Sequence, residues 1–169
     1  MQTVHVDRRL FLLGSCAVAA MTAAPGLAAA AAAADPYAAS PVRKLKEADW
    51  KKKLPAASFE VLRHEDTERP FSSPLNNEHR KGVFACLGCD LPLFRSDWKF
   101  DSGTGWPSFY TAIDGALARK ADFKLALEER TEYHCARCLG HQGHVFNDGP
   151  KPTGLRYCNN GVALKFVPA

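Results

Sequence analysis

Hydrophobic and polar positions alternate over several short stretches of the chain, as they do in half-buried β-strands. Strand-like stretches occur at 82–85, 123–127, 131–134 and 162–166. Glycines and prolines separate most of them into short elements. By contrast, 45–62 suits one or two short helices, interrupted at Pro55 because proline cannot continue a helix from within. The pattern predicts a mainly β fold of antiparallel sheets with a few short N-terminal helices.

The last strand-like stretch extends backward toward a cysteine. If the alternation continues through this segment, a single strand carries on one face Arg156, Cys158, Asn160, Val162, Leu164 and Phe166. A free cysteine is most often a small buried core residue. Here a cation and an amide flank the thiol at strand spacing, and a neighbouring cation stabilises a thiolate. The pattern therefore favours a reactive thiol at Cys158.

The first 34 residues have a different character, with Arg8 and Arg9 preceding an apolar and then alanine-rich stretch. This order is typical of a twin-arginine export signal, and the alanine tract offers several cleavage sites. We therefore expect 1–34 to be an export signal and the protein to be periplasmic, with no stable membrane insertion after cleavage. The alternatives are a membrane tether through Cys16, which follows a lipobox-like sequence, or through an uncleaved signal.

Composition limits the number of domains and the class of partner. The chain has 169 residues, 46% of them hydrophobic and 24% charged, which suits one globular domain. Its net charge of +4 is small and its basic residues are scattered, which argues against a nucleic-acid partner. We expect a flexible leader at 35–44 and one domain at 45–169, acting as a monomer.

Four cysteines form two C-x-x-C pairs, Cys86 with Cys89 and Cys135 with Cys138. Each short turn can aim two sulfurs at one point, and two such turns commonly hold a tetrahedral zinc ion. Gly88 in the first pair suits a tight turn. Because four thiolates leave no open coordination position, we predict one structural zinc per chain. The alternative is a set of disulfides or redox-active pairs, which exported proteins often contain.

Two more groups of residues suggest chemistry. His141 and His144 follow the second cysteine pair closely, and a histidine near a thiolate can act as a proton donor near neutral pH. The alternatives for them are zinc ligands or surface residues. Trp106, Phe109 and Tyr110 crowd a glycine-flanked stretch, where they either cover a core edge or line a small apolar pocket.

Four stretches of the chain resemble the motifs of one enzyme family. They are, in order, GVFACLGCDLPLF, KFDSGTGWPSF, HCARCLGHQGHVFNDGP and GLRYCNNGVALKF. Together they closely resemble the B-type methionine sulfoxide reductases, over a region from about Trp50 to Phe166. These enzymes return the R epimer of methionine sulfoxide to methionine. The resemblance implies that 45–169 is a methionine-R-sulfoxide reductase domain whose substrates are oxidised proteins.

The resemblance also implies roles for the polar site residues. Cys158 stands at the position of the family's nucleophile, which attacks the sulfoxide sulfur, forms a sulfenic acid and releases methionine. His141 and His144 match the histidines that protonate the departing oxygen or hold the water that does so. Asn160 and Arg156 stand at the matching positions beside the nucleophile.

The resemblance also implies roles for two aromatic residues, but the chain lacks one cysteine that many family members have. Trp106 and Phe146 match the aromatic residues that pack around the sulfoxide's methyl group. Many members carry a second cysteine where this chain has Thr104, and that cysteine resolves the sulfenic acid into a disulfide. Here no resolving thiol is left after the predicted zinc ligands and the signal cysteine are set aside. The resemblance therefore implies a one-cysteine enzyme regenerated by an external thiol or a thioredoxin-like partner. Smaller departures occur at Asn159 and Gly161.

Overall fold

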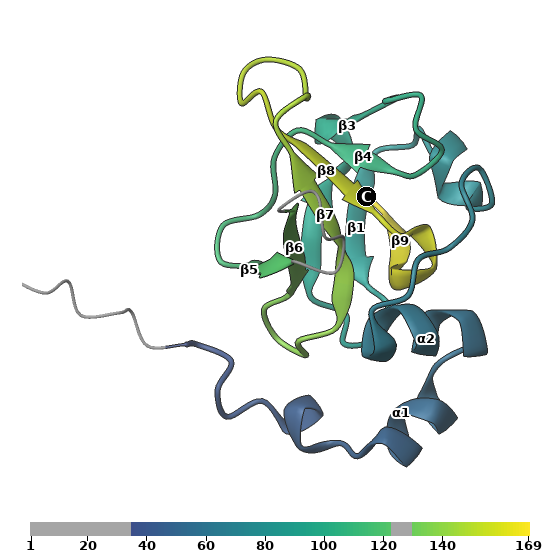
Figure 1. Ribbon diagram of the computed structural model, residues 1–169, viewed down its shortest axis with the longest axis vertical. Coiled ribbons are helices and arrows are strands. Elements are labelled where there is room, and N and C mark those ends of the chain that lie inside the picture. Colours follow the sequence, from purple (N-terminus) through teal and green to yellow (C-terminus); the bar gives the residue numbers. More distant parts are fainter. Residues whose placement is uncertain (1–34, 123–129) are drawn as a thin grey trace, which may run out of the picture. The chain divides into compact units, whose positions relative to one another are not determined.

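Two antiparallel sheets contain all the strands of the described residues (Figure 1). The structure is a computed structural model that describes residues 35–122 and 130–169, all within one unit, Asp35–Ala169. The predicted signal at 1–34 and the predicted strand at 123–127 lie outside the described residues.

The smaller sheet has three strands in the order β2-β1-β9. Its strands are β1 (Gly82–Cys86), β2 (Pro92–Arg95) and β9 (Leu164–Pro168). The larger sheet has six strands in the order β3-β4-β8-β7-β6-β5. Its strands are β3 (Lys99–Phe100), β4 (Ser108–Phe109), β5 (Leu117–Asp122), β6 (Arg130–Cys135), β7 (His141–Phe146) and β8 (Arg156–Asn159). Every pairing is antiparallel, which confirms the predicted fold class and the strands expected at 82–85 and 131–134.

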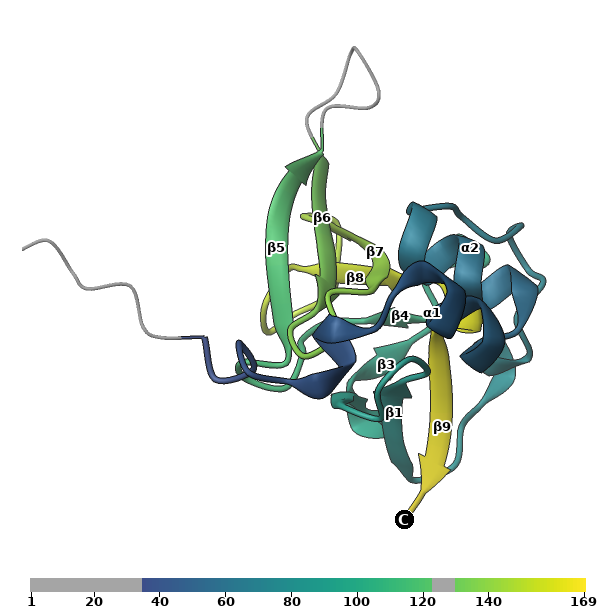
Figure 2. The same cartoon turned by 90° about the horizontal axis from the view of Figure 1, so that it is seen from below.

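Two short α-helices precede the sheets, as the interrupted pattern at 45–62 predicts. They are α1 (Glu47–Lys53) and α2 (Ala56–His64), with Pro55 as the N-cap of the second. Helix α2 packs against β7 (Figure 2). Across the part of the chain that the structure describes, no helix has the length and apolar character needed to cross a membrane.

Short 3-10 helices join the other elements: η1 (Pro41–Lys44), η2 (Pro74–Asn77), η3 (Ser96–Trp98) and η4 (Gly161–Ala163). The first of them lies within the segment expected to be a flexible leader. Its Arg43 donates hydrogen bonds to the backbone carbonyls of Ala136 and Arg137, inside the second C-x-x-C turn. Residues before the predicted domain boundary therefore contact the domain.

An aromatic core lies between the two sheets. Phe94 of the smaller sheet stacks on Phe109 of the larger one, with ring centroids 4.2 Å apart and planes 6° apart. Phe84, Tyr133 and Tyr157 pack around this pair edge to face. All five rings are buried, and each contributes roughly 1.5–3 kcal/mol on burial. This core fixes β8, which carries Cys158, against the rest of the fold.

The prediction of one continuous strand from Arg156 to Phe166 is wrong. The chain leaves the larger sheet after β8, turns through η4 and enters the smaller sheet as β9. The turn is stabilised from a distant segment, because the Glu68 carboxylate accepts the backbone N–H groups of Gly161 and Val162. The strand face that carries Arg156 therefore ends at Cys158, and Val162 lies in the turn instead of a strand.

Candidate active site

Four buried cysteine sulfurs gather at one point, between the turn after β1 and the turn after β6. The Sγ atoms of Cys86 and Cys138 are 3.6 Å apart, those of Cys89 and Cys135 are 3.4 Å apart, and all four lie within 4.8 Å of one another. Contact with neighbouring sulfurs raises the pKa of Cys86, since thiolates repel one another at this range. The Gln142 amide also donates to the Cys86 sulfur at 3.4 Å. This donor set fits a tetrahedral metal ion that balances the thiolate charge.

The turns that hold these sulfurs do not depend on Gly88. Its backbone has no positive φ, and a Cβ at this position would meet only ordinary contacts of 3.4 Å or more. The left-handed residues are instead Asp90 and Leu139, each directly after the second cysteine of its pair. Their N–H groups bond back to the carbonyls of Cys86 and Cys135, both at 2.9 Å. The predicted reason for Gly88 is therefore wrong, although the paired turns themselves are as expected.

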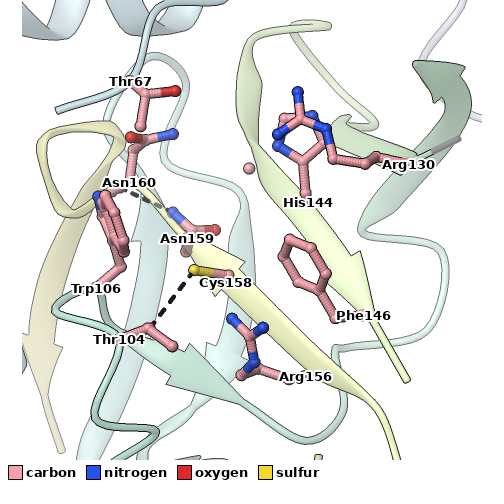
Figure 3. Close-up of a pocket in the computed structure, with 11 residues that line it drawn as sticks. Thr67, Thr104, Trp106, Arg130, His144, Phe146, Arg156, Cys158, Asn159 and Asn160 are labelled. Carbon is pink, nitrogen blue, oxygen red and sulfur yellow. Dashed lines mark hydrogen bonds between the residues drawn. The ribbon is translucent and has the colours of Figure 1, made fainter. Parts of the chain in front are cut away.

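The fifth described cysteine, Cys158, is half-buried and lies in a cavity of about 260 Å³, which we call the reaction cavity (Figure 3). The cavity brings together most of the predicted site residues, namely Trp106, His144, Phe146, Arg156, Cys158 and Asn160. His141 is the exception, because it does not line this cavity.

Strand register places the nucleophile candidate between two neighbours. Cys158 on β8 pairs with His144 on β7 and with Ser108 on β4. The approach of β7 to β8 requires Gly143, where a Cβ would lie 1.9 Å from the Cys158 carbonyl oxygen. The glycine of the H-Q-G-H stretch therefore lets the histidine strand run close beside the cysteine.

The environment of Cys158 has opposing effects on its acidity. Burial raises the pKa of the thiol, and this effect outweighs the lowering by Arg156 and Thr104. The Thr104 Oγ1 lies 4.0 Å from the Cys158 Sγ. Arg156 is held in place by Asp148, which accepts two hydrogen bonds of 2.8 Å from the guanidinium, and it lies 4.3 Å from the centroid of the Phe146 ring. Arg156 therefore acts in the expected direction, but the free protein keeps Cys158 mainly as a thiol near neutral pH.

His144 is the histidine on the cavity wall. Its Nε2 donates to the buried carboxylate of Asp122 at 2.8 Å, and the Arg130 guanidinium donates to the same oxygen at 3.0 Å. Because Nε2 is bound to Asp122, Nδ1 is the nitrogen left to exchange a proton. The Arg130 Nε is buried and has no hydrogen-bond partner among the described residues.

His141 packs beside His144, with ring centroids 5.5 Å apart. Residues three apart on a regular strand face opposite sides, but here the register between β6 and β7 shifts at Tyr133 and His134. The His141 Nδ1 bonds to Glu132 at 2.8 Å, and burial lowers the pKa of the ring. Its Nε2 is buried without a partner among the described residues. His141 is thus a neutral, buried neighbour of the cavity histidine.

One acidic residue of the N-terminal segment joins several parts of the cavity. The Glu68 carbonyl accepts the Trp106 indole N–H at 3.1 Å, and the Glu68 N–H donates to the Asn160 side chain at 3.0 Å. Its carboxylate caps η4, directly after β8. Burial raises the pKa of this carboxyl, opposed by the two backbone N–H groups that it accepts. Glu68 therefore orients both a wall and an amide of the cavity.

Sequence reasoning missed several of these residues. Thr67 and Arg130 line the cavity, Asp122 holds His144 and Glu68 holds Trp106, while Glu132 holds the neighbouring His141. Glu132 pairs directly with His144 across β6 and β7, so a correct strand register would have suggested it. No local signal marks Thr67 or Glu68, because they reach the site from an irregular segment about ninety residues away.

One family model and several known proteins are similar to this chain. The SelR domain family matches residues 54–168. The peptide methionine sulfoxide reductase MsrB of Agrobacterium fabrum is 48% identical over 130 residues, covering 76% of this chain and 96% of that protein. The enzyme of the same name from Pseudomonas entomophila is 52% identical over 120 residues, covering 71% of this chain and 92% of that protein. Peptide methionine sulfoxide reductase B1 of Arabidopsis thaliana chloroplasts is 48% identical over 121 residues, covering 72% of this chain and 60% of that protein.

Among solved structures, the Mis18 "Yippee-like" domain is similar with a TM-score of 0.44 and 18% identity, covering 53% of this chain and 98% of that chain. The family assignment rests on the SelR match and on the relatives that share about half of their residues with this chain. The chain belongs to the SelR domain family, the family of the MsrB methionine sulfoxide reductases.

Proposed function

We propose that the protein reduces the R epimer of methionine sulfoxide in oxidised proteins to methionine. The observation that carries this proposal is the reaction cavity, which sets the Cys158 sulfur beside a histidine, an amide and two aromatic rings. A sulfoxide oxygen leaves poorly unless it is protonated, so the reaction needs an acid as well as a nucleophilic thiolate. Each need has a candidate side chain in this one cavity.

Cys158 attacks the sulfoxide sulfur in the proposed first step. The oxygen is transferred with one proton to the cysteine, which becomes a sulfenic acid, and methionine is released. His144 supplies the proton, with Asp122 orienting it. Arg156 favours the thiolate form of Cys158, and Asn160, which lines the cavity, would hold the sulfoxide oxygen. His141 supports His144 through the contact between the two rings.

The apolar side of the cavity would select the epimer. Trp106 and Phe146 form walls suited to the methyl group, with the Trp106 ring fixed by the Glu68 carbonyl. With the methyl between the rings and the oxygen at the polar side, only one configuration at sulfur exposes that sulfur to Cys158. We assign this configuration to the R epimer.

Cys86, Cys89, Cys135 and Cys138 would hold one structural zinc ion, away from the reacting atoms. The ion would tie the turn after β1 to the turn after β6, segments more than forty residues apart, and so stabilise the sheets that carry the cavity. No step of the proposed reaction involves it.

Regeneration and location complete the proposal. With Thr104 at the position beside Cys158, an external thiol or a thioredoxin-like partner would reduce the sulfenic acid. The residues at 1–34 would export the protein by the twin-arginine route, so its substrates would be oxidised periplasmic proteins. Replacing Arg8 and Arg9 by lysine should leave the protein in the cytoplasm, as cell fractionation would show. Unchanged recovery in the periplasm would refute this route.

The decisive test is a single turnover with a peptide that contains one methionine sulfoxide. We expect one methionine per chain from the R epimer, none from the S epimer, and a trapped sulfenic acid on Cys158 by intact mass. Cys158→Ser is the matched control, since it replaces only the sulfur. Methionine formed from the S epimer alone, or formed by the Cys158→Ser variant, would overturn the proposal.

A further inference from the structure

A second cavity, of about 370 Å³, lies beside the reaction cavity, and we call it the rear cavity. Its walls include Asp101, Ser102 and Asp148. Thr104 and Arg156 line both cavities. The two cavities are therefore neighbours that share the side chains next to the Cys158 sulfur.

The Cys158 sulfur lies between the proposed acid, His144, and the side chains that line both cavities. Figure 3 shows Thr104 and Arg156 on one side of Cys158, with His144 and Asn160 on the other. The Thr104 hydroxyl is 4.0 Å from the Sγ and also bonds to Ser102, at 2.8 Å. A small molecule in the rear cavity would therefore be separated from the sulfur by the shared side chains of Thr104 and Arg156.

The chemistry of the second half-reaction sets a direction of approach. A thiolate displaces the oxygen of a sulfenic acid along the line opposite the S–O bond. In the proposed first step the oxygen arrives from the reaction cavity, on the side of His144, which can return a proton so that the oxygen leaves as water. The attacking thiolate must then come from the opposite side, where Thr104 and the rear cavity lie.

We propose that the rear cavity admits the thiol that reduces oxidised Cys158, and that its carboxylates favour cationic over anionic thiols; this rests on the function proposed above. The thiol sulfur forms an S–S bond to Cys158 as the S–O bond breaks and water leaves. A second thiol then attacks this mixed disulfide, which releases the oxidised external disulfide and restores the Cys158 thiol. Two external thiols thus supply the two electrons.

The charge preference comes mainly from Asp101. Asp148 is neutralised by its two hydrogen bonds to Arg156, whereas Asp101 is exposed and uses one oxygen to accept the Gly103 N–H at 2.9 Å. Lys99 interacts electrostatically with Asp101. Its amine, however, donates its hydrogen bond to the Asn76 carbonyl at 2.7 Å and not to the Asp101 carboxylate. An exposed carboxylate of this kind should change the relative rates of oppositely charged thiols about twofold to fivefold at low salt.

The test measures the reduction of sulfenic acid on Cys158 by three small thiols: cysteamine, 2-mercaptoethanol and mercaptoethanesulfonate. Rates are compared at equal thiolate concentration, because the thiolate is the attacking form. In Asp101→Asn, which keeps the oxygen that accepts the Gly103 N–H, we expect the cysteamine-to-sulfonate rate ratio to fall about threefold at low salt, and less at high salt. The single-turnover rate of sulfoxide reduction should not change.

Asp66→Asn is the matched control at the other cavity. Asp66 is also an exposed aspartate that accepts the next backbone N–H, from Thr67, whose side chain lines the reaction cavity. An equal or larger effect of Asp66→Asn would show that the thiol enters through the reaction cavity, and an unchanged ratio in Asp101→Asn would also overturn the proposal. Sulfenic acid made with one equivalent of hydrogen peroxide keeps the test independent of sulfoxide reduction. Failure of the R-sulfoxide to oxidise Cys158 counts against the proposed function instead.

Discussion

The five described cysteines are divided between two regions with opposite surroundings. In the four-cysteine cluster every sulfur is buried and its closest neighbours are other sulfurs and one amide. In the reaction cavity a single half-buried sulfur lies among a cation, a hydroxyl, amides and a histidine bound to a carboxylate. The same side chain therefore has two kinds of surroundings. One suits a metal ion, and the other suits the proposed attack on a substrate.

The two regions also differ in how the chain builds them. Each cysteine pair sits in one tight turn, so four ligands need only two short segments and one contact between them. The reaction cavity instead draws on five segments, from the irregular stretch around Thr67 to the strand that carries Cys158. A local change should therefore remove the metal site as a whole, whereas the cavity should lose its functions one at a time.

The largest expected effect comes from breaking the four-cysteine cluster. Cys135→Ser removes a ligand, and a structural zinc contributes on the order of 10 kcal/mol to small zinc domains. Since the whole stability of such a domain is only about 5–15 kcal/mol, we expect the variant to be unfolded or insoluble. Circular dichroism and zinc content by mass spectrometry would measure this. A folded, active, metal-free variant would show that the cluster does not hold a structural ion.

Cys158→Ser should have the opposite effect, because it should remove the activity and leave the fold and the zinc content in place. We expect sulfoxide reduction to fall by at least about three orders of magnitude, because the nucleophile is gone. The free energy of unfolding should change by no more than about 1 kcal/mol, since serine fits the half-buried site, and the zinc content should stay at one per chain. Chemical denaturation and turnover assays test both parts. Loss of zinc in this variant would contradict the separation of the two regions.

A smaller effect is expected from Asp122→Asn, which changes the residue that orients the proposed acid, His144. The change keeps the shape but removes the carboxylate that orients His144, so we expect kcat to fall on the order of tenfold to a hundredfold. KM should change little, because Asp122 does not line the cavity. Steady-state kinetics of the variant would measure both parameters.

Asp97→Asn is a suitable control for this variant, because Asp97 is an exposed residue paired with Arg95 away from the cavity. It should leave kcat and KM as they are. If Asp122→Asn behaves like this control, His144 is not oriented by Asp122.

The sequence predicts the cysteine cluster more completely than the cavity, for a physical reason. Two C-x-x-C turns are local, so their spacing alone indicates four converging ligands. Alternation likewise predicts the strands that become β1 and β6, since a half-buried strand repeats every two residues. The break at η4 could not be predicted, because the cap that stabilises it comes from Glu68, more than ninety residues earlier.

The cavity shows the same limit. Cys158, Arg156 and the aromatic walls follow from short motifs, but the motif cannot tell His141 from His144. The distinction depends on the register shift between β6 and β7, which is a property of the pairing and not of either strand. Asp122 reaches His144 from β5, across β6, and Arg130 bonds to Asp122, so only the folded sheet reveals them.

The smallest expected effect concerns the acidity of the sulfurs in the two regions. Burial raises the pKa of Cys158 above the 9.0 of an ordinary thiol, and Arg156 partly opposes this. Since the thiolate is the reactive form, alkylation of Cys158 by iodoacetamide should be slow at pH 8 and should still increase with pH above 9. Arg156→Gln removes the opposing cation, so the profile should move to higher pH and the rate at pH 8 should fall about threefold to tenfold. The cluster thiols, held by zinc, should stay unmodified throughout.

Arg95→Gln is the control, because it removes a similar arginine, stacked over Trp98 at 5.7 Å, and should leave the profile unchanged. A profile for the native protein centred below pH 8 would mean that Arg156 outweighs burial and that Cys158 is already a thiolate before substrate binds.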